Sequence, residues 1–321
     1  MHIHIQNRLH NAFLPITRVA VDGTSIVKDH RVTIGDTDAD FAEAIRTAEV
    51  VVTTLDQLKA RFPCAAPGLK AVFLAHAGVD GLDGHNPLPE GIMLLNNSGA
   101  HARKAGEFVL MATLMLAGNM HRLIAQQHQR QWRPLFSPSI AGRRITIIGV
   151  GGLGSGAARA LRPLGVHLTG IRNGDQPHPD FDLTLSIHHL DHVLEATDTL
   201  VLAAPLTPAT RQMIGLDQLA RLPNHAHLIN IGRGELLDQR ALIDALHVGQ
   251  IDGAVLDVQQ VEPLPPEDRL WSTPNLIITP HVSSTDAAGY AAETLRVLGD
   301  NLAAMTLGLT PPNLVDVARG Y

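Results

Sequence analysis

Residues 145–156 read I-T-I-I-G-V-G-G-L-G-S-G, and this stretch decides the fold of the chain. Its first four residues are isoleucine and threonine without a charge, which is typical of a buried strand in a parallel sheet. Three glycines follow in the spacing G-x-G-x-x-G, and the alanine-rich segment after them predicts a helix over about residues 155–164. A strand, a glycine-rich turn and a helix in this order predict a dinucleotide-binding unit.

Each of the three positions requires glycine for a different physical reason. Gly149 allows the tight turn from strand to helix, Gly151 lets the backbone approach a pyrophosphate, and Gly154 lets the helix pack close to its strand. The first turn of the helix adds N–H groups and a partial positive charge, which favour phosphate binding. A glycine-rich turn without a ligand is the alternative, and the motifs further along the chain decide between the two.

The composition bounds the class of protein. A chain of 321 residues is too long for one hydrophobic core and predicts about two domains. The net charge of −6 argues against a nucleic-acid partner, and the longest apolar run, residues 108–118, is too short for a membrane span. The single cysteine, Cys64, forms no internal disulfide and the N-terminus lacks a signal-peptide profile, so we expect a cytoplasmic protein. His2 and His4 have no thiolate or carboxylate nearby, and we expect no metal site.

The first hundred residues predict a small α/β unit, because short apolar runs alternate with amphipathic ones. The expected strands are the N-terminal segment and residues 19–21, 50–53, 71–75 and 92–96, and the expected helices are residues 38–47 and 55–61. The strand at 71–75 runs into the small-residue turn H-A-G-V-D, which contains Ala77 and Gly78. Ligands bind beyond the carboxyl ends of parallel strands, so this turn is either a ligand site or a simple tight turn.

A long helix is expected from about residue 101 to 129, after the turn N-N-S-G. Its middle, residues 108–116, is apolar nearly all round, which predicts burial. Such a helix beside a domain boundary also offers a surface to a second copy of the chain, and we expect a homodimer. Residues 131–140 contain two prolines and predict a loop that leads to the glycine-rich turn.

The end of the next expected strand, residues 166–171, bears on the choice of cofactor. NAD requires an acidic side chain here, which accepts a hydrogen bond from the 2′-hydroxyl of the adenosine ribose. This sequence has Arg172 and Asn173 instead, and the only carboxylate close by is Asp175. A guanidinium suits a 2′-phosphate in charge and geometry, so the sequence favours NADP over NAD, unless Arg172 is a solvated surface side chain.

Polar residues follow the remaining strands of this domain, which are expected at residues 198–204, 227–231, 254–258 and 277–279. Arg233 stands in a G-R-G turn after the second of them, Asp257 lies near the end of the third, and His281 follows the last. Because the carboxyl ends of parallel strands meet at one edge of a sheet, these side chains are expected to gather there. A final alanine-rich helix is expected over about residues 286–307.

Five pieces of sequence together resemble a known family. They are the glycine-rich turn, A-P-L-T at 204–207, I-G-R-G at 231–234, L-D-V at 256–258 with E-P at 262–263, and T-P-H at 279–281. In this order they are similar to the D-isomer-specific 2-hydroxyacid dehydrogenases, the family of glyoxylate/hydroxypyruvate reductases and phosphoglycerate dehydrogenase. The resemblance is strong from about residue 96 to 284 and weaker before residue 71.

The resemblance implies an α/β fold with two Rossmann-like domains. A doubly wound cofactor domain, residues 99–285, is inserted into a smaller flavodoxin-like substrate domain, residues 1–98 and 286–321. The active site of the family lies in a cleft, and segments near residues 98–101 and 284–289 are expected to act as hinges that close it.

The reduction of a 2-keto acid requires the residue types that gather at this edge. Charge develops on the carbonyl oxygen, which needs a proton from a general acid, and the substrate carboxylate needs a cation and N–H donors. Arg233 offers a planar fork of donors to both groups. His281 donates the proton in reduction, while Glu262 orients the imidazole and favours its protonated form. Alone, each has a structural explanation, as a turn arginine, a surface charge or a capping histidine; together they indicate a catalytic set.

The resemblance also implies binding residues. The amides around Ala77 and Gly78 receive the substrate carboxylate together with Arg233, and Asp257 contacts the nicotinamide carboxamide. The residues implied to bind the cofactor are Gly149, Gly151, Gly152, Leu153, Gly154, Arg172, Asn173, Ala204, Pro205, Ile231, Asp257, His281 and Ser284.

The sequence therefore predicts an NADPH-dependent reductase of small 2-keto acids, such as glyoxylate or hydroxypyruvate, with no nucleic-acid or membrane partner. One alternative is a nucleotide-sensing binding protein without turnover, like the transcriptional corepressors related to this family. Another is an NAD-dependent dehydrogenase of a phosphorylated 2-hydroxy acid, which needs further cations in the first hundred residues. The sequence offers Arg18, Lys28 and Lys70 for this but does not place them.

Overall fold

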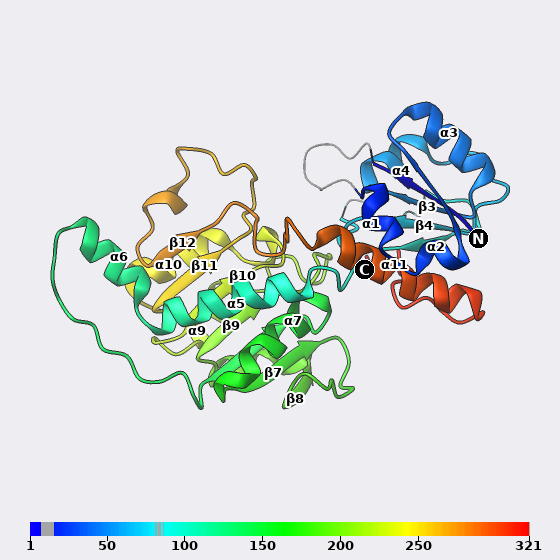
Figure 1. The fold of residues 1–321 in the computed structure, drawn as a ribbon. Helices are drawn as coiled ribbons and strands as arrows, with labels where there is room; N and C mark the ends of the chain where they lie inside the picture. The colour runs from blue at the N-terminus through cyan, green and yellow to red at the C-terminus, as the bar shows by residue number, and fades with distance from the viewer. Residues whose placement is uncertain (8–15, 81, 83–84, 86, 321) are drawn as a thin grey trace. The chain divides into compact units, whose positions relative to one another are not determined.

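The structure, a computed structural model, describes residues 1–321 apart from 8–15, 81, 83–84, 86 and 321, and apart from the side chain of Val27. The chain forms two compact units (Figure 1). Unit 1 consists of Met1–Ala100 and Asp286–Tyr321, and unit 2 consists of His101–Thr285. Unit 2 is therefore an insertion, and it begins two residues later than the expected boundary at residue 99.

Unit 1 is a parallel sheet covered by helices. Its strands are β1 (His2–Gln6), β2 (Arg31–Gly35), β3 (Val50–Thr53), β4 (Ala71–Leu74) and β5 (Met93–Leu95). Its helices are α1 (Arg18–Asp22), α2 (Ile26–Asp29), α3 (Asp38–Thr47), α4 (Leu55–Arg61) and α11 (Tyr290–Thr306). The strand order is β2-β1-β3-β4-β5 and every pairing is parallel, which is the flavodoxin-like order that the resemblance implies.

Two expectations for unit 1 are corrected by the structure. Residues 19–21 belong to helix α1 and are not a strand. The run V-A-V is too short to separate a period of 2 from one of 3.6, and the Thr17 side chain, which accepts a hydrogen bond from the backbone N–H of Ala20, caps a helix here. Strand β2, which the sequence did not predict, occupies the sheet edge beside β1.

Unit 2 is a seven-stranded parallel sheet. Its strands are β6 (Arg144–Ile148), β7 (His167–Arg172), β8 (Leu183–Ser186), β9 (Thr199–Leu202), β10 (His227–Asn230), β11 (Gly253–Leu256) and β12 (Leu276–Ile278). Its helices are α5 (Ala102–Ala117), α6 (Met120–His128), α7 (Gly152–Leu161), α8 (Leu190–Leu194), α9 (Leu216–Arg221) and α10 (Gln239–Val248), with short 3₁₀ turns η1 (Arg162–Leu164), η2 (Ile187–His189), η3 (Gly234–Leu236) and η4 (Arg269–Ser272). The strand order is β12-β11-β10-β9-β6-β7-β8. Successive strands are therefore added on one side of β6 up to β8 and on its other side from β9 onward, and the switch point lies between β6 and β9. Ligands bind at such a switch point in open α/β sheets.

The alternating side chains of β6 show how the sheet of unit 2 is covered. Ile145 and Ile147 lie in one core cluster, which is shared with α5 and α7, whereas Ile148 lies in the cluster on the other face. Figure 1 shows α5 beside α7. The two helices approach closely because Gly156 faces Ala102, where a Cβ would lie 1.9 Å from the carbonyl oxygen.

The expected single helix over residues 101–129 is wrong. Helix α5 ends at Ala117 and α6 begins at Met120, with a bend of 65° between them. Asn119 adopts a left-handed conformation with φ +58°, which a continuous helix does not allow. Among the described residues, no single helix is long and apolar enough to cross a membrane, although this bent pair meets the criteria of length and composition together.

Candidate functional site

The glycine-rich turn lies at the switch point of the unit 2 sheet. Gly149 has φ +96°, and a Cβ there would lie 2.7 Å from the backbone of Ala203 and Ala204, at the end of β9. A Cβ on Gly154 would lie 1.8 Å from the carbonyl oxygen of Gly149. The space around Gly151 is open, with no heavy atom within 4 Å of where its Cβ would be. Two glycines thus allow close packing and the third leaves room for a ligand, which is the arrangement that a pyrophosphate requires.

The expected cofactor residues Gly152 and Leu153 form the first turn of α7, directly after its N-cap Gly151. Ser155, buried in the next turn, donates a hydrogen bond of 2.8 Å to the carbonyl oxygen of Val150 and so fixes the glycine-rich turn to the helix. The N–H groups of this first turn point out of the helix end, where they favour an anion.

Arg172 is the last residue of β7, and it is half-buried beside the exposed Asn173. Asp175, the carboxylate close by in sequence, accepts a hydrogen bond of 3.0 Å from the backbone N–H of Ser186 at the end of β8. The carboxylate is therefore engaged in holding the loop after β7 to the neighbouring strand. The position directly at the strand end, where NAD-binding proteins place an acid, is occupied by a guanidinium.

The next two expected cofactor segments follow β9 and β10. Ala204 is buried and Pro205 is exposed, while the side chain of Ile231 is buried in the core shared with α5. The backbone N–H of Ile231 donates to the carbonyl oxygen of Leu202, at 3.0 Å, and extends the pairing of β9 and β10 beyond the assigned strands. Both segments therefore border the switch point.

Asn230, at the end of β10, shapes the turn that carries Arg233. Its side chain is fully buried, accepts a hydrogen bond of 3.1 Å from the backbone N–H of Gly232 and donates one of 2.9 Å to the carbonyl oxygen of Arg233. A Cβ on Gly234 would lie 2.0 Å from the backbone of Gln259, so this turn presses against the segment after β11. Asn230 is not among the residues predicted from the sequence, where its signal is a lone amide at the end of an apolar strand.

His281 and Glu262 form a hydrogen-bonded pair at the same edge. Nδ1 of His281 lies 2.8 Å from Oε2 of Glu262, and Oε1 of Glu262 accepts a bond of 2.9 Å from the backbone N–H of Gln259. An ionised carboxylate only accepts hydrogen bonds, so the proton on this side of the ring sits on Nδ1. The other ring nitrogen, Nε2, is then the one that can exchange a proton with a substrate. Arg233, Glu262 and His281 follow the adjacent strands β10, β11 and β12.

Asp257, which directly follows β11, is fully buried and holds the turn that carries His281. Its carboxylate accepts hydrogen bonds from the Thr279 hydroxyl at 2.6 Å and from the backbone N–H groups of Val282 and Ser283, both at 2.9 Å. Its backbone carbonyl accepts from the N–H of His281 at 2.8 Å. These bonds stabilise His281 in a left-handed conformation, with φ +54°. Contact of Asp257 with a nicotinamide carboxamide stays a prediction.

Ser284, another expected cofactor residue, is tied to the start of α5. The carbonyl oxygen of Ser284 accepts a hydrogen bond of 2.9 Å from Nδ1 of His101. Burial lowers the pKa of His101, so its imidazole is neutral at pH 7 and joins the first residue of unit 2 to the segment at the end of this unit through an uncharged bond.

The turn with Ala77 and Gly78 lies beyond the carboxyl end of β4, in unit 1. Both residues are half-buried. The backbone N–H groups of Ala77, Gly78 and Val79 make no hydrogen bond to any residue that the structure describes. Consecutive free N–H groups of this kind form a concave receptor for an anion.

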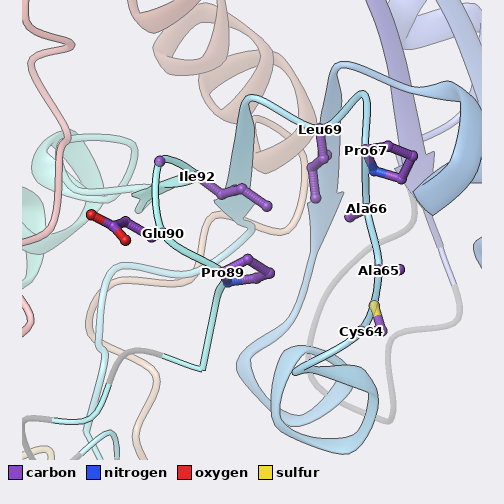
Figure 2. A pocket seen from close by; sticks show the side chains of 9 residues that line it. Cys64, Ala65, Ala66, Pro67, Leu69, Pro89, Glu90 and Ile92 are labelled. Carbon is purple, nitrogen blue, oxygen red and sulfur yellow. The ribbon is translucent and has the colours of Figure 1, made fainter.

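Two further observations concern the described part of the chain outside this sheet edge. No group of three or more His, Cys, Asp or Glu side chains there could hold a metal ion. A hollow of about 450 Å³ in unit 1 is lined by residues 64–67, 69 and 89–92, and Figure 2 shows the carboxylate of Glu90 turned away from Cys64. This hollow offers no cation to an acidic substrate.

Comparisons with known proteins agree with this geometry. The family model for the D-isomer specific 2-hydroxyacid dehydrogenase, NAD binding domain, matches residues 110–283. A glyoxylate reductase of Korarchaeum cryptofilum is 31% identical over 285 residues, which cover 85% of this chain and 84% of the relative. The chain belongs to the D-isomer-specific 2-hydroxyacid dehydrogenases.

Solved structures of the 2-hydroxyacid dehydrogenases share the fold. An NADPH-dependent glyoxylate/hydroxypyruvate reductase from Sinorhizobium meliloti, in complex with NADP and sulfate, has a TM-score of 0.81 and 27% identity, covering 100% of this chain and 99% of that one. A family member from Xanthobacter autotrophicus, in complex with NADPH and MES, has a TM-score of 0.80 and 25% identity, with the same coverage. The family and fold expected from the sequence are therefore confirmed.

Proposed function

We propose that this 2-hydroxyacid dehydrogenase reduces small 2-keto acids to D-2-hydroxy acids with NADPH. The observation that carries the proposal is the His281–Glu262 pair, which stands on the same sheet edge as Arg233 and the glycine-rich turn. Glyoxylate and hydroxypyruvate are the proposed substrates, because relatives that match across the chain are named as reductases of these acids.

The chain's own residues account for the proton and the charges of the reaction. The nicotinamide, when bound, supplies the hydride. Nε2 of His281 gives its proton to the carbonyl oxygen, while Glu262 stabilises the charged ring through Nδ1. The guanidinium of Arg233 polarises the carbonyl and binds the carboxylate. In unit 1, the N–H groups of Ala77 and Gly78 are proposed to receive carboxylate oxygens.

The proposed cofactor is NADP, and NAD is the weaker ligand. Gly149, Gly151 and Gly154 together with the first turn of α7 fit the pyrophosphate that both dinucleotides share. Arg172 distinguishes the two, because its guanidinium pairs with a 2′-phosphate. NADP or NADPH is bound in both solved structures described above, which supports the same choice here.

The test is consumption of NADPH in the presence of glyoxylate, hydroxypyruvate and a phosphorylated 2-keto acid, with NADH as the second cofactor. Arg233→Ala is expected to lower kcat/KM for glyoxylate roughly 10²-fold or more, since two charge-assisted bonds are lost. Arg240→Ala, which removes an exposed arginine from the same unit, is the matched control. Absence of turnover with every acid and both cofactors would refute the proposal. A preference for the phosphorylated acid would contradict the substrate class, and two candidate cations for it are already paired, Arg18 with Asp22 and Lys70 with Glu49.

We also propose that the enzyme is a cytoplasmic homodimer. Unit 2 exposes a set of large apolar side chains on α5, on α6 and in the segment between α6 and β6; they are Met111, Leu114, Met120, Ile124, Trp132 and Phe136. Trp132 and Phe136 are 98% and 91% exposed, which is unusual for aromatic side chains without a partner. Light scattering after size-exclusion chromatography tests the dimer, and a monomeric mass for the native chain, together with no change of mass in a Trp132→Ser, Phe136→Ser double variant, would contradict it.

A further inference from the structure

The turn after β4 has four consecutive carbonyl groups that are all hydrogen-bonded to the protein. The Ala75 oxygen accepts from Asn97 at 3.1 Å and from the Tyr290 hydroxyl, and the His76 oxygen accepts from the backbone N–H of Asn97 at 3.1 Å. The Ala77 oxygen accepts from the Asn96 side chain at 3.0 Å. The fourth carbonyl, that of Gly78, accepts its bond from a side chain within the turn.

Fixing these carbonyls also fixes the N–H groups. In a trans peptide the C=O of one residue and the N–H of the next point in opposite directions. The bonds to the oxygens of His76, Ala77 and Gly78 therefore direct the N–H groups of the next residue in each case, which are Ala77, Gly78 and Val79, away from the bonded side. These are the N–H groups that make no hydrogen bond within the described chain.

The imidazole of His76 is the group that holds the Gly78 carbonyl. Its Nδ1 lies 2.8 Å from that oxygen and its Nε2 lies 3.0 Å from the backbone nitrogen of Leu55. A carbonyl only accepts and a backbone N–H only donates, so the proton of this ring sits on Nδ1 and Nε2 is an acceptor. The neutral ring with its proton on Nδ1 is the form that satisfies both contacts.

We propose that His76 is a positioning residue for the carboxylate of the substrate. Through Nδ1 it sets the Gly78–Val79 peptide and directs the N–H of Val79 to the same side as those of Ala77 and Gly78, whose peptides are held by Asn97 and Asn96, so that the three N–H groups meet a small carboxylate. Through Nε2 it has a separate structural task, because it satisfies the N–H of Leu55 in the first turn of α4. The inference rests on the proposed function, in which Ala77 and Gly78 bind the substrate carboxylate.

Three substitutions separate the two tasks. The amide nitrogen of asparagine is bonded to Cγ, like Nδ1 of histidine, so His76→Asn keeps a donor for the Gly78 oxygen. The amide oxygen of glutamine is as many bonds from Cα as Nε2, so His76→Gln keeps an acceptor for Leu55. His76→Phe keeps the ring and loses both bonds.

The measurement is steady-state kinetics with glyoxylate and NADPH, together with thermal unfolding of each variant. His76→Phe and His76→Gln are expected to raise KM for glyoxylate roughly tenfold with kcat and KM for NADPH little changed, since a donor to a charged group is misplaced. His76→Asn is expected to keep the wild-type KM for glyoxylate and to lower the melting temperature instead.

The outcomes distinguish this inference from the proposed function. If the wild type reduces glyoxylate and all three variants keep its KM, His76 does not position the turn and the inference is overturned. A rise in KM for His76→Asn as large as that for His76→Phe would also overturn it, because a donor to the Gly78 oxygen would then not preserve the binding of glyoxylate. If the wild type reduces no keto acid, the proposed function fails and the inference fails with it.

Discussion

Acidification is expected to destabilise unit 2 through one buried histidine, His121. It lies in the first turn of α6, with its side chain 1% exposed, and its Nε2 is 3.9 Å from Oδ2 of Asp252. Burial lowers the pKa of His121 from 6.5 to about 4. The charges of Arg122 and His227 act in the same direction, whereas Asp252 opposes them.

The size of the effect follows from linkage between protonation and folding. Between pH 6.5 and about 4 the unfolded chain binds a proton at His121 and the folded chain does not, so the free energy of unfolding rises with pH in this window. Its contribution is present above pH 6.5 and is lost progressively on acidification. One pKa unit corresponds to about 1.4 kcal/mol, so this residue alone costs about 2 kcal/mol between pH 7.5 and pH 5.

The assay is urea unfolding at pH 7.5 and pH 5, at one protein concentration, followed by tryptophan fluorescence. The chain has two tryptophans, Trp132 and Trp271, and both belong to unit 2, so the signal reports on the unit that contains His121. His121→Leu removes the titrating group and is expected to lose about 2 kcal/mol less than the wild type over this pH interval. His128→Leu makes the same exchange at the exposed end of α6 and serves as the control.

Other histidines, such as the half-buried His101, add to the acid slope of the wild type, because burial lowers the pKa of this side chain too. The comparison between wild type and His121→Leu removes their contribution. Parallel curves of unfolding free energy against pH for these two proteins would refute the reasoning, since they would mean that His121 is protonated equally in the folded and unfolded chain.

Three further predictions concern the reaction and the cofactor. His281→Asn is expected to lower kcat for glyoxylate by roughly 10²–10⁴-fold with little change in KM for NADPH; an unchanged kcat in stopped-flow or steady-state assays would remove it as the general acid. Arg172→Ser is expected to lower kcat/KM for NADPH at least tenfold while leaving that for NADH nearly unchanged, and a loss shared equally by both would show that the guanidinium ignores the 2′-phosphate. Gly154→Ala places a methyl group 1.8 Å from the Gly149 oxygen and should abolish NADPH binding in a fluorescence titration, whereas Gly151→Ala, with open space around it, should keep the fold and lose affinity.

The sequence predicted the central parts of both sheets, and the reason is physical. Parallel strands are buried on both faces, so segments such as 145–148 and 227–230 are mainly apolar and end at a glycine or a polar residue. The glycine spacing likewise specified the switch point, because the separate demands of a positive φ, open space and close packing fall on three fixed positions.

Other features depend on contacts that a single segment does not contain. The edge strands β2 and β8 were missed because they are short and partly exposed, so their apolar pattern is weak. The break after Ala117 was missed because Gly118 and Asn119 are compatible with a helix until packing decides their conformation. The role of His76 depends on the backbone of Leu55 and Gly78, and no spacing in the sequence indicates a bond to a backbone atom.

Asp257 has a structural task that the sequence did not predict, beside the contact with the nicotinamide that stays a prediction. The strand pattern predicts only that Asp257 lies at the sheet edge with Arg233 and His281, and the family resemblance implies its contact with the nicotinamide. In the structure its carboxylate accepts three hydrogen bonds from the turn that carries His281, and its backbone oxygen accepts a fourth. A non-glycine residue in the left-handed region costs roughly 1 kcal/mol or more, and those bonds offset the cost. With this backbone conformation, Nδ1 of His281 lies 2.8 Å from Glu262, so the buried carboxylate of Asp257 helps to position the proposed proton donor.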